Sequence, residues 1–430
     1  MRHPDIKELY SLFRENPVVC TDTRVVKQGS MFFALKGTNF NANAFVKDAI
    51  DKGCKYAVID EEQYYSNGCI LVHDVLTTLQ NLANFHRKKF TIPVIGITGT
   101  NGKTTTKELT SAVLSKRYKT LFTQGNLNNH IGVPLTLLNL TKEHEIAIIE
   151  MGANHVGEIA ELCKIAEPGY GIITNIGKAH LEGFGGYEGV IKAKSELYNY
   201  IKENHGTIFV NADDDLLMKL SAGIKRLTYG SNIVAHIKGF HNKDSFLAKG
   251  RFILDGNEVE ISSRLAGVYN IHNILAAICI GNNFEVSSES IKEAIEEYVP
   301  SNNRSQIVKK GSNTIWVDAY NANPSSMKIA IENFAWQGDS SKILILGDMF
   351  ELGSESHNEH QLIADLIENQ PSWNEVYLIG SEFSKVKSSA KMYNTVESFM
   401  EWLAKHPLNN STILLKGSRG MKMERILTMI

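Results

Sequence analysis

Short apolar runs alternate with amphipathic helical patterns along most of the chain, an order that is typical of parallel α/β units. The first part is predicted to contain strands at 31–35, 56–60 and 69–72, with helices at 45–53 and 75–90. The central strands are predicted at 94–98, 146–150, 171–176 and 207–211. The last part is predicted to contain strands at 314–318, 342–347, 375–380 and 412–417, separated by helices near 325–337, 357–370 and 395–406.

These elements predict an α/β protein of three domains. We expect a smaller α/β domain over residues 1–88, a central parallel-sheet domain like that of P-loop ATPases over 89–300, and a Rossmann-like, doubly wound domain over 301–430. Residues 228–268 lose the helical pattern and are expected to form an antiparallel flap on the central domain. A chain of 430 residues is also too long for one ordinary hydrophobic core.

The composition is that of a soluble globular protein, with 43% hydrophobic and 21% charged residues. Its net charge of −2 offers no basic field to a nucleic-acid backbone, so we expect no polynucleotide partner. No apolar run approaches the ~20 residues of a membrane span, and the first residues lack the apolar stretch of a signal peptide. The five cysteines are scattered without a C-x-x-C pair, which favours packed free thiols and a reducing cytoplasm.

The segment TGTNGKTTT at 98–106 links a predicted strand directly to a predicted helix. This order is typical of a phosphate-binding loop, because backbone N–H groups and the helix dipole together attract an anion. Gly99 and Gly102 allow the tight turn. Lys103 is expected to reach the β- and γ-phosphates of a nucleotide, and Thr104 to hold Mg²⁺. An isoleucine stands where the strict motif has its first glycine, so a plain surface turn is the alternative. The flanking strand and helix favour nucleotide binding.

Polar side chains follow the neighbouring predicted strands. Glu150 ends one strand, and His180 comes shortly after the next. Each residue alone has an ordinary alternative, as a solvated turn carboxylate or a hydrogen-bonded loop histidine. Thr104, Glu150 and His180 fall at one edge of the inferred sheet, where open parallel sheets bind ligands, and this placement strengthens the metal-ligand interpretation of Glu150 and His180 while the ordinary one stays open.

Other polar residues leave more than one interpretation open. Asn211, Asp213 and Asp214 follow a strand and are equally compatible with facing the nucleotide and with capping the next helix. Lys194 lies in a predicted helix, and its spacing does not distinguish it from a surface lysine. No Ser-His-Asp or Cys-His order indicates a protein nucleophile, which favours direct phosphoryl transfer to a bound substrate.

Six further segments, taken with the phosphate loop, resemble the Mur ligases, which form amide bonds in bacterial cell-wall synthesis. They are GNLNNHIGVPLTLL (125–138), EMGANHVGEI (150–159), TNIGKAHLEGFG (174–185), DAYNANPSSM (318–327), LGDMFELG (346–353) and KGSRGMKME (416–424). With the segments TDTR (21–24) and ALKG (34–37) of the first part of the chain, the resemblance spans all three predicted domains. YNANPSSM and GDMFELG are most similar to the branch that adds D-alanyl-D-alanine to UDP-N-acetylmuramoyl-tripeptide, which implies these two substrates. We expect a cytoplasmic enzyme that acts as a monomer.

The resemblance also implies roles for individual residues. Contacts to the uridine diphosphate end or the rest of this substrate are implied for Thr23, Arg24, Lys36, Gly37, Asn126, Asn128 and Asn129. ATP contacts are implied for Gly99, Thr100, Asn101, Gly102, Lys103, Thr104 and Thr105, for Asn270 and Asn273 at the adenine, and for Arg304 and Asp318. Two Mg²⁺ ions are implied, with Thr104, Glu150, His180 and a carbamylated Lys194 as ligands. Catalysis is implied to depend on Lys103, Glu150, His180 and Lys194.

The chain departs from the family pattern at two places. Asn41, Ala42 and Asn43 replace the usual Asp-Gly-His after the ALKG segment, and Val268 and Tyr269 precede the adenine asparagine. The implied reaction transfers the γ-phosphate of ATP to the tripeptide carboxylate, and the dipeptide amine then attacks the acyl phosphate. Two alternatives are another ATP-dependent ligase, such as a folylpolyglutamate synthase or a different Mur ligase, and a nucleotide-dependent binding module that forms no bond.

Overall fold

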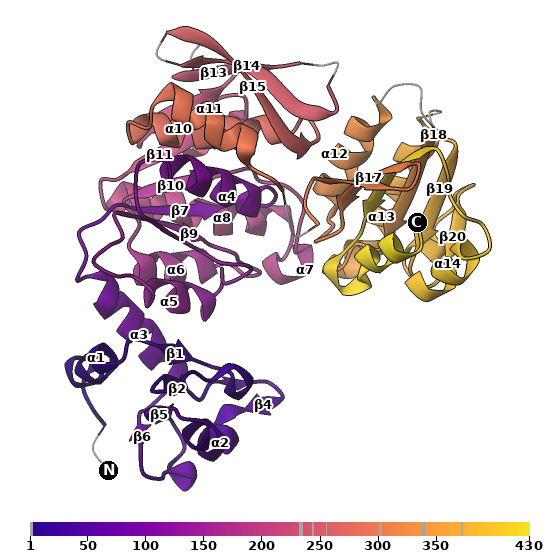
Figure 1. The fold of residues 1–430 in the computed structure, drawn as a ribbon. Helices are drawn as coiled ribbons and strands as arrows, with labels where there is room; N and C mark the ends of the chain where they lie inside the picture. The colour runs from indigo at the N-terminus through magenta and orange to yellow at the C-terminus, as the bar shows by residue number, and fades with distance from the viewer. Residues whose placement is uncertain are drawn as a thin grey trace.

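The computed structural model describes residues 3–231, 235–242, 245–254, 256–300, 303–336, 341–370 and 373–430. Three large sheets follow one another along the chain, and a short hairpin is formed by β3 Lys36–Gly37 and β4 Phe40–Asn41. Figure 1 shows the sheets as three units, with the C-terminal unit beside the central one. None of the helices in the described part of the chain combines the length and apolar character that crossing a bilayer requires.

The N-terminal unit is a four-stranded parallel sheet in the order β1-β2-β5-β6. Its elements are α1 Ile6–Glu15, β1 Val19–Cys20, β2 Met31–Phe33, α2 Val46–Asp51, β5 Tyr56–Ile59, β6 Cys69–Leu71 and α3 Val75–Arg87. Leu79 and Leu82 of α3 share a hydrophobic core with Leu137 and Leu162 of the central unit. Helix α3 therefore attaches the N-terminal unit to the central one.

The central unit is built on a nine-stranded sheet in the order β15-β14-β13-β12-β11-β10-β7-β9-β8. Every pairing from β8 to β13 is parallel, and the last two pairings are antiparallel. The strands are β7 Val94–Thr98, β8 Thr120–Phe122, β9 Ile146–Glu150, β10 Tyr170–Ile173, β11 Thr207–Asn211, β12 Lys225–Gly230, β13 Ile237–His241, β14 Leu247–Leu254 and β15 Asn257–Ala266. The antiparallel strands expected as a flap on the central domain are therefore the edge of the central sheet itself.

Helices cover both faces of the central sheet (Figure 1). One face carries α4 Lys103–Leu114, α10 Asn270–Asn283 and α11 Ser288–Glu297, and the other carries α5 Gly132–Leu137, α6 Glu158–Ala166 and α8 Tyr187–Glu203. The short helices α7 Leu181–Phe184 and α9 Asp215–Leu220 complete the unit. In β9, Ile146 and Ile148 pack on the α4 side, whereas Ala147 and Ile149 pack on the α8 side. Burial on both faces explains why this strand is apolar without alternation.

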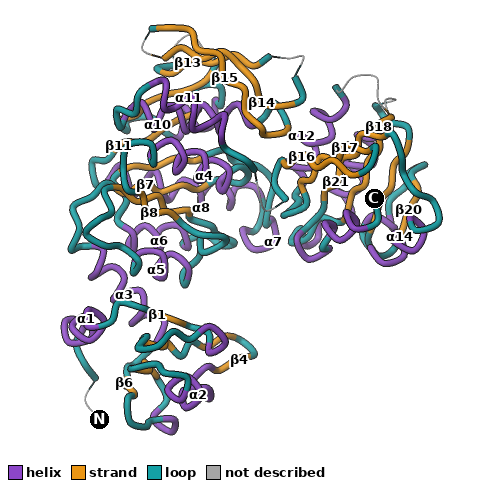
Figure 2. The backbone as a smooth tube through the Cα atoms, viewed as in Figure 1, coloured by secondary structure: helices purple, strands orange, loops and turns teal. Residues whose placement is uncertain are grey.

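The C-terminal unit has six strands in the order β16-β17-β21-β18-β19-β20, all parallel except the β16–β17 pair. The strands are β16 Gln306–Lys310, β17 Asn313–Asp318, β18 Ser341–Gly347, β19 Glu375–Ile379, β20 Lys391–Tyr393 and β21 Ser411–Lys416. Helices α12 Pro324–Ala335 and α13 Ser356–Glu368 pack on one face and α14 Val396–Leu403 packs on the other. Figure 2 shows the strands of this unit with α12 and α14 beside them. The predicted doubly wound arrangement is confirmed.

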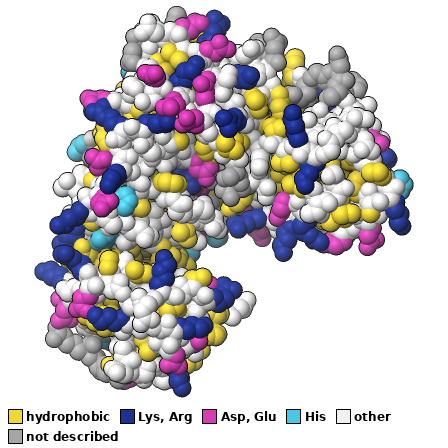
Figure 3. All heavy atoms as spheres, in the orientation of Figure 1, with side chains coloured by type: hydrophobic (Ala, Val, Ile, Leu, Met, Phe, Trp, Pro, Cys, Tyr) yellow, Lys and Arg dark blue, Asp and Glu magenta, His cyan; other side chains and the backbone are white. Residues whose placement is uncertain are grey.

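The predicted strands at 94–98, 146–150 and 207–211 match β7, β9 and β11 residue for residue. The predicted strand at 171–176 was too long, because the chain leaves the sheet at Thr174, whose hydroxyl donates to the carbonyl of Asn101 at 2.6 Å. All five cysteines are free and buried, as expected. Acidic and basic side chains are interspersed on the central unit (Figure 3). We retain residues 88 and 300 as proposed domain boundaries.

Candidate active site

A cleft of about 640 Å³ is lined by residues of the central and C-terminal units. Its volume lies within the range of small-molecule sites. The sequence-predicted residues that line it are Gly99, Thr100, Asn101, Gly102, Lys103, Thr104, Thr105, Asn126, Asn128, Asn129, Glu150, His180, Lys194, Asn270, Asn273, Arg304 and Asp318. The structure therefore brings together residues that are separated by more than 200 positions in the chain.

The phosphate loop joins β7 to the 12-residue helix α4. Gly99 has a φ of +141°, and a Cβ there would lie 2.0 Å from Thr174 Oγ1. Gly102 has a φ of +78°, and a Cβ there would lie 2.6 Å from Asn273 Oδ1. Only glycine fits these two positions without strain. The N-terminus of α4 thus lies at the cleft, with N–H groups that have no partner inside the helix.

Glu150 stands at the end of β9, next to the phosphate loop. Its side chain is 1% exposed, and Oε1 accepts hydrogen bonds from Thr104 Oγ1 at 3.2 Å and from Asn128 Nδ2 at 2.8 Å. Oε2 is buried and has no hydrogen-bond partner among the residues that the structure describes. A buried anionic oxygen without a donor is unfavourable, so this atom is suited to a cation.

Two lysines face the cleft in different ways. Lys103 Nζ donates to the carbonyls of Gly99 at 2.7 Å and Thr100 at 2.9 Å, and burial lowers its pKa to about 8. Lys194 is 3% exposed and makes no hydrogen bond or ion pair with a described residue, although its Nζ lies 5.3 Å from the ring centroid of Phe184. Burial, assisted by the charge of Lys103, lowers the pKa of Lys194 to about 7. A substantial fraction of this amine is therefore neutral near pH 7.

The C-terminal unit touches the phosphate-loop region directly. Contacts that cross between the units include Asn323 Nδ2 to Asn101 Oδ1 at 2.8 Å, Lys178 Nζ to Glu359 Oε1 at 2.6 Å, and His180 Nδ1 to Glu351 Oε2. The carboxylate of Glu359 is 5% exposed, so Lys178 neutralises a charge that is almost withdrawn from water. The two units are thus closed on each other around the cleft.

The residues predicted to contact adenine, and those predicted to contact ATP from the C-terminal unit, line the cleft. Some of their polar groups already form hydrogen bonds within the protein. Asn273 Nδ2 donates to Asn270 Oδ1 at 2.8 Å, while Asn273 Oδ1 accepts from Thr106 Oγ1 at 3.1 Å. The first bond lies within α10, and the second holds α10 to α4, the helix that follows the phosphate loop. The guanidinium of Arg304 lies 3.5 Å from the ring centroid of Tyr320, and its Nε is buried without a hydrogen-bond partner in the described part of the chain.

The structure distinguishes between the two interpretations of the polar residues after β11, which were a role in facing the nucleotide and a role in capping the next helix. Asn211 lines the cleft. Asp214 caps α9, because its carboxylate accepts the N–H of Leu217 at 3.0 Å. Asp213 accepts the N–H of Ser231 at 2.7 Å. Only Asn211 is therefore placed to face a ligand in the cleft.

Several cleft residues were missed by the sequence analysis. Tyr320, Lys416 and Arg419 lie at the carboxyl ends of β17 and β21 and line the cleft. Lys416 Nζ lies 2.5 Å from Asp318 Oδ2, and Arg419 Nη1 donates to the hydroxyl of Tyr320 at 3.0 Å. The rule that parallel sheets bind ligands beyond their strand ends would have found them, had it been applied to this second sheet.

The residues predicted to hold the uridine end are Thr23, Arg24, Lys36 and Gly37, and none of these lines the cleft. Arg24 is 86% exposed and pairs with Asp22. Lys36 Nζ lies 3.1 Å from Asp60 Oδ1, so its charge is already partly neutralised. The structure does not bring these four residues to the phosphate loop.

Comparison with known proteins agrees with this geometry. Models of the Mur ligase middle domain and of the Mur ligase, glutamate ligase domain match residues 97–281 and 303–419. The UDP-N-acetylmuramoyl-tripeptide–D-alanyl-D-alanine ligase of Bacillus subtilis is 33% identical over 428 residues, which cover 95% of this chain and 92% of that protein. The ligase of the same name from Escherichia coli is 32% identical, with the same coverage.

Solved structures give the same result. A crystal structure of MurF from Acinetobacter baumannii has a TM-score of 0.85 and 31% identity, covering 95% of this chain and 92% of that one. MurF ligase from Thermotoga maritima in complex with ADP also has a TM-score of 0.85, with 27% identity and 96% coverage of both chains. ATP use therefore fits both the phosphate loop and the relatives. Similarity over nearly the whole length shows that this chain belongs to the Mur ligase family.

Proposed function

We propose that this chain is an ATP-dependent ligase that joins D-alanyl-D-alanine to UDP-N-acetylmuramoyl-tripeptide, giving ADP, phosphate and the pentapeptide precursor. The observation that carries the proposal is a phosphate loop that faces the C-terminal sheet across one cleft. Relatives that bear this name match nearly the whole chain. We propose that the enzyme acts as a monomer in the cytoplasm, where its five free thiols remain reduced.

The reaction proceeds in two steps. An oxygen of the tripeptide carboxylate attacks the γ-phosphorus of ATP, and ADP leaves. The dipeptide nitrogen then attacks the acyl carbon, the C–O bond to phosphate breaks, and the amine proton is released. Lys103 offsets the charge of the phosphates, which otherwise repel the incoming carboxylate. Contacts between the closed units exclude water from the acyl phosphate.

The residues present fit magnesium. Glu150 Oε2 is a buried anionic oxygen to which no described residue donates a hydrogen bond, and the hydroxyl of Thr104 lies beside the same carboxylate. Within the described ranges no three His, Cys, Asp or Glu side chains converge, so phosphate oxygens and water would complete the coordination. His180 and a carbamylated Lys194 would serve a second ion. Bound Mg²⁺ supplies neutralisation of the charge that ATP and the carboxylate bring together.

Carbamylation of Lys194 is supported by its surroundings. The neutral amine adds to the carbon of CO₂, and one proton leaves, so that a buried cation becomes a buried anion able to hold a metal. Replacing Lys194 with alanine should abolish ligation, and added short carboxylates should restore part of it. Lys192, exposed on the same helix, provides the matched control, and its alanine variant should keep full activity. Full activity of the Lys194 variant would remove it from the mechanism.

The remaining predicted contacts belong to the nucleotide-linked tripeptide. We assign the uridine diphosphate end to Thr23, Arg24, Lys36 and Gly37, and the part nearer the reacting carboxylate to Asn126, Asn128 and Asn129. The last three line the cleft, and Asn128 donates a hydrogen bond to Glu150, which supports this assignment. Binding of the first part would require a substrate that extends from the cleft to the N-terminal unit.

Phosphate release in the presence of ATP and Mg²⁺ tests the proposal. Release should require both the tripeptide nucleotide and D-alanyl-D-alanine, and mass spectrometry should identify the pentapeptide product. Tripeptides with meso-diaminopimelate and with lysine at the third position should be compared. Phosphate release that requires neither the tripeptide nucleotide nor D-alanyl-D-alanine would contradict the ligase assignment. Product formation only with another amino acid would assign the chain to a different ligase of the family.

A further inference from the structure

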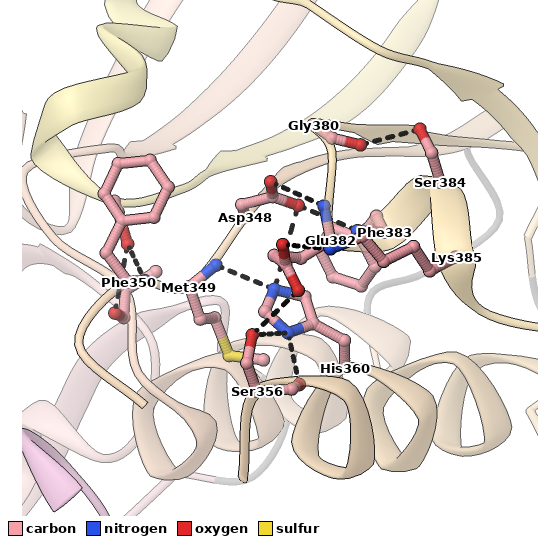
Figure 4. Close-up of polar contacts among 12 residues, drawn as sticks. Asp348, Met349, Phe350, Ser356, His360, Gly380, Glu382, Phe383, Ser384 and Lys385 are labelled. Atoms are coloured by element: carbon pink, nitrogen blue, oxygen red, sulfur yellow. Dashed lines mark hydrogen bonds and ion pairs between the residues drawn. The ribbon is translucent and has the colours of Figure 1, made fainter. Parts of the chain in front are cut away.

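The segment LGDMFELG at 346–353 has no role in the reaction as described above. It ends β18 and begins the loop that follows, and the loop is anchored through its backbone and side chains (Figure 4). Asp348 is 1% exposed, and its carboxylate accepts the N–H groups of Glu382 at 3.0 Å and Phe383 at 2.9 Å. Hydrogen bonds to a buried carboxylate are charge-assisted and stronger than neutral ones.

The next two residues of the loop are held as well. The N–H of Met349 donates to Nε2 of His360 at 3.0 Å, and the N–H of Phe350 donates to Oγ of Ser418 at 2.9 Å. His360 is fully buried, and its Nδ1–H donates to the carbonyl of Ser356 at 2.7 Å. Three successive residues are therefore fixed immediately before the loop reaches the central unit.

The residue that follows them, Glu351, contacts Nδ1 of His180. The backbone is left-handed at both residues, with φ of +64° at Glu351 and +51° at His180. This conformation is unfavourable for residues other than glycine and persists where the surroundings impose it, commonly at functional sites. Glu351 is 58% exposed, and a polar contact at such an exposed position contributes little to stability. Stability therefore does not explain why two strained residues meet here.

We propose that Glu351 is a positioning residue for His180. Its carboxylate accepts the Nδ1–H of the imidazole and so selects the neutral tautomer whose Nε2 lone pair is available to a divalent cation. The inference rests on the proposed function, which assigns His180 to magnesium. Because the two residues belong to different units, the tautomer is selected only while the units are closed. The loop thereby links closure of the two units to the availability of the His180 Nε2 lone pair for a cation.

Nitrogen NMR of the ¹⁵N-histidine protein, with ADP and without metal, tests the tautomer directly. His180 should carry its proton on Nδ1 in the wild type. Glu351→Ala should lose this preference, whereas Glu351→Gln keeps an acceptor oxygen and should retain it. Glu355→Gln removes an exposed carboxylate from the same loop and should leave the His180 signals unchanged.

Turnover gives the second measurement. Glu351→Ala should lower kcat about 10- to 100-fold, the usual effect of removing a group that orients a metal ligand, with KM for both peptide substrates within about twofold. Glu351→Gln should recover part of the loss, and Glu355→Gln should match the wild type. A wild-type tautomer or a wild-type kcat in the alanine variant overturns the inference. Failure of the wild type to form the amide contradicts the proposed function instead, and the NMR result still reports the contact.

Discussion

Replacing Lys194 with methionine should stabilise the folded protein while it abolishes ligation. The lysine ammonium is buried without a hydrogen bond or ion pair to any described residue, and its pKa falls from 10.5 to about 7. Methionine has a similar length and no charge, and its sulfur can pack against Phe184, which now lies beside the ammonium. The variant therefore removes the charge with little change in packing.

The size of the gain follows from linkage between protonation and folding. Between pH 7 and 10.5 the unfolded chain binds a proton at this lysine and the folded chain largely does not, so wild-type stability rises with pH. Because one pKa unit corresponds to 1.36 kcal/mol, the buried lysine destabilises the folded protein by about 4 kcal/mol at pH 7 and by about 2 kcal/mol at pH 9. The advantage of methionine should therefore be about twice as large at pH 7 as at pH 9 and vanish above pH 10.5.

Urea unfolding at the two pH values measures this difference. Buffers should be free of CO₂, because a carbamate would give the wild type a different charge, and the series should be repeated with bicarbonate. Lys192→Met, on the exposed side of the same helix, controls for the general effect of a lysine-to-methionine change. An advantage of Lys194→Met that is equal at pH 7 and pH 9, or a loss of stability at pH 7, would refute the reasoning.

Three further single variants and one double variant test the cleft. Gly99→Ala should abolish ATP binding in calorimetry, because its Cβ would lie 2.0 Å from a threonine hydroxyl; retained affinity would contradict the assigned loop geometry. Asn128→Ala removes the amide that holds Glu150 and should lower kcat about 10- to 100-fold, whereas an unchanged kcat would leave that hydrogen bond without a catalytic role. Lys178→Met should make closure of the two units less favourable by about 1 kcal/mol, which corresponds to a roughly fivefold loss in kcat/KM. Adding Glu359→Gln to this variant should restore most of the lost kcat/KM. If the wild type and both variants have the same kcat/KM, the pair does not support closure.

Secondary structure could be predicted from the sequence where the local pattern of apolar residues is enough to determine it. The strands β7, β9 and β11 lie between helical layers and are buried along their length, so they appear in the sequence as unbroken apolar runs. Shorter or partly exposed elements were missed: β8 Thr120–Phe122 is only partly buried, and α5 Gly132–Leu137 begins with a glycine and contains a proline. Strand β10 ended early because its continuation bonds to the phosphate loop.

The candidate site was predictable to a smaller extent. Glu150 and His180 could be proposed because they follow strands that were already assigned to one sheet. The spacing of Lys194 gave no signal, and only its burial between a helix and the cleft separates it from the exposed Lys192. Glu351 was contained in a family-like segment, but its contact with the central unit depends on how two sheets face each other.

By itself, then, the sequence determined the class of fold and the phosphate loop, because apolar runs and obligatory glycines act through neighbours in the chain. The tertiary structure alone decided which side chains meet. The sheet order places β7 between β9 and β10, which brings Glu150 to the loop that holds Thr104, and closure of the C-terminal unit adds Glu351 to His180. Strand order and closure depend on contacts between distant segments, which local hydrophobic patterns do not encode.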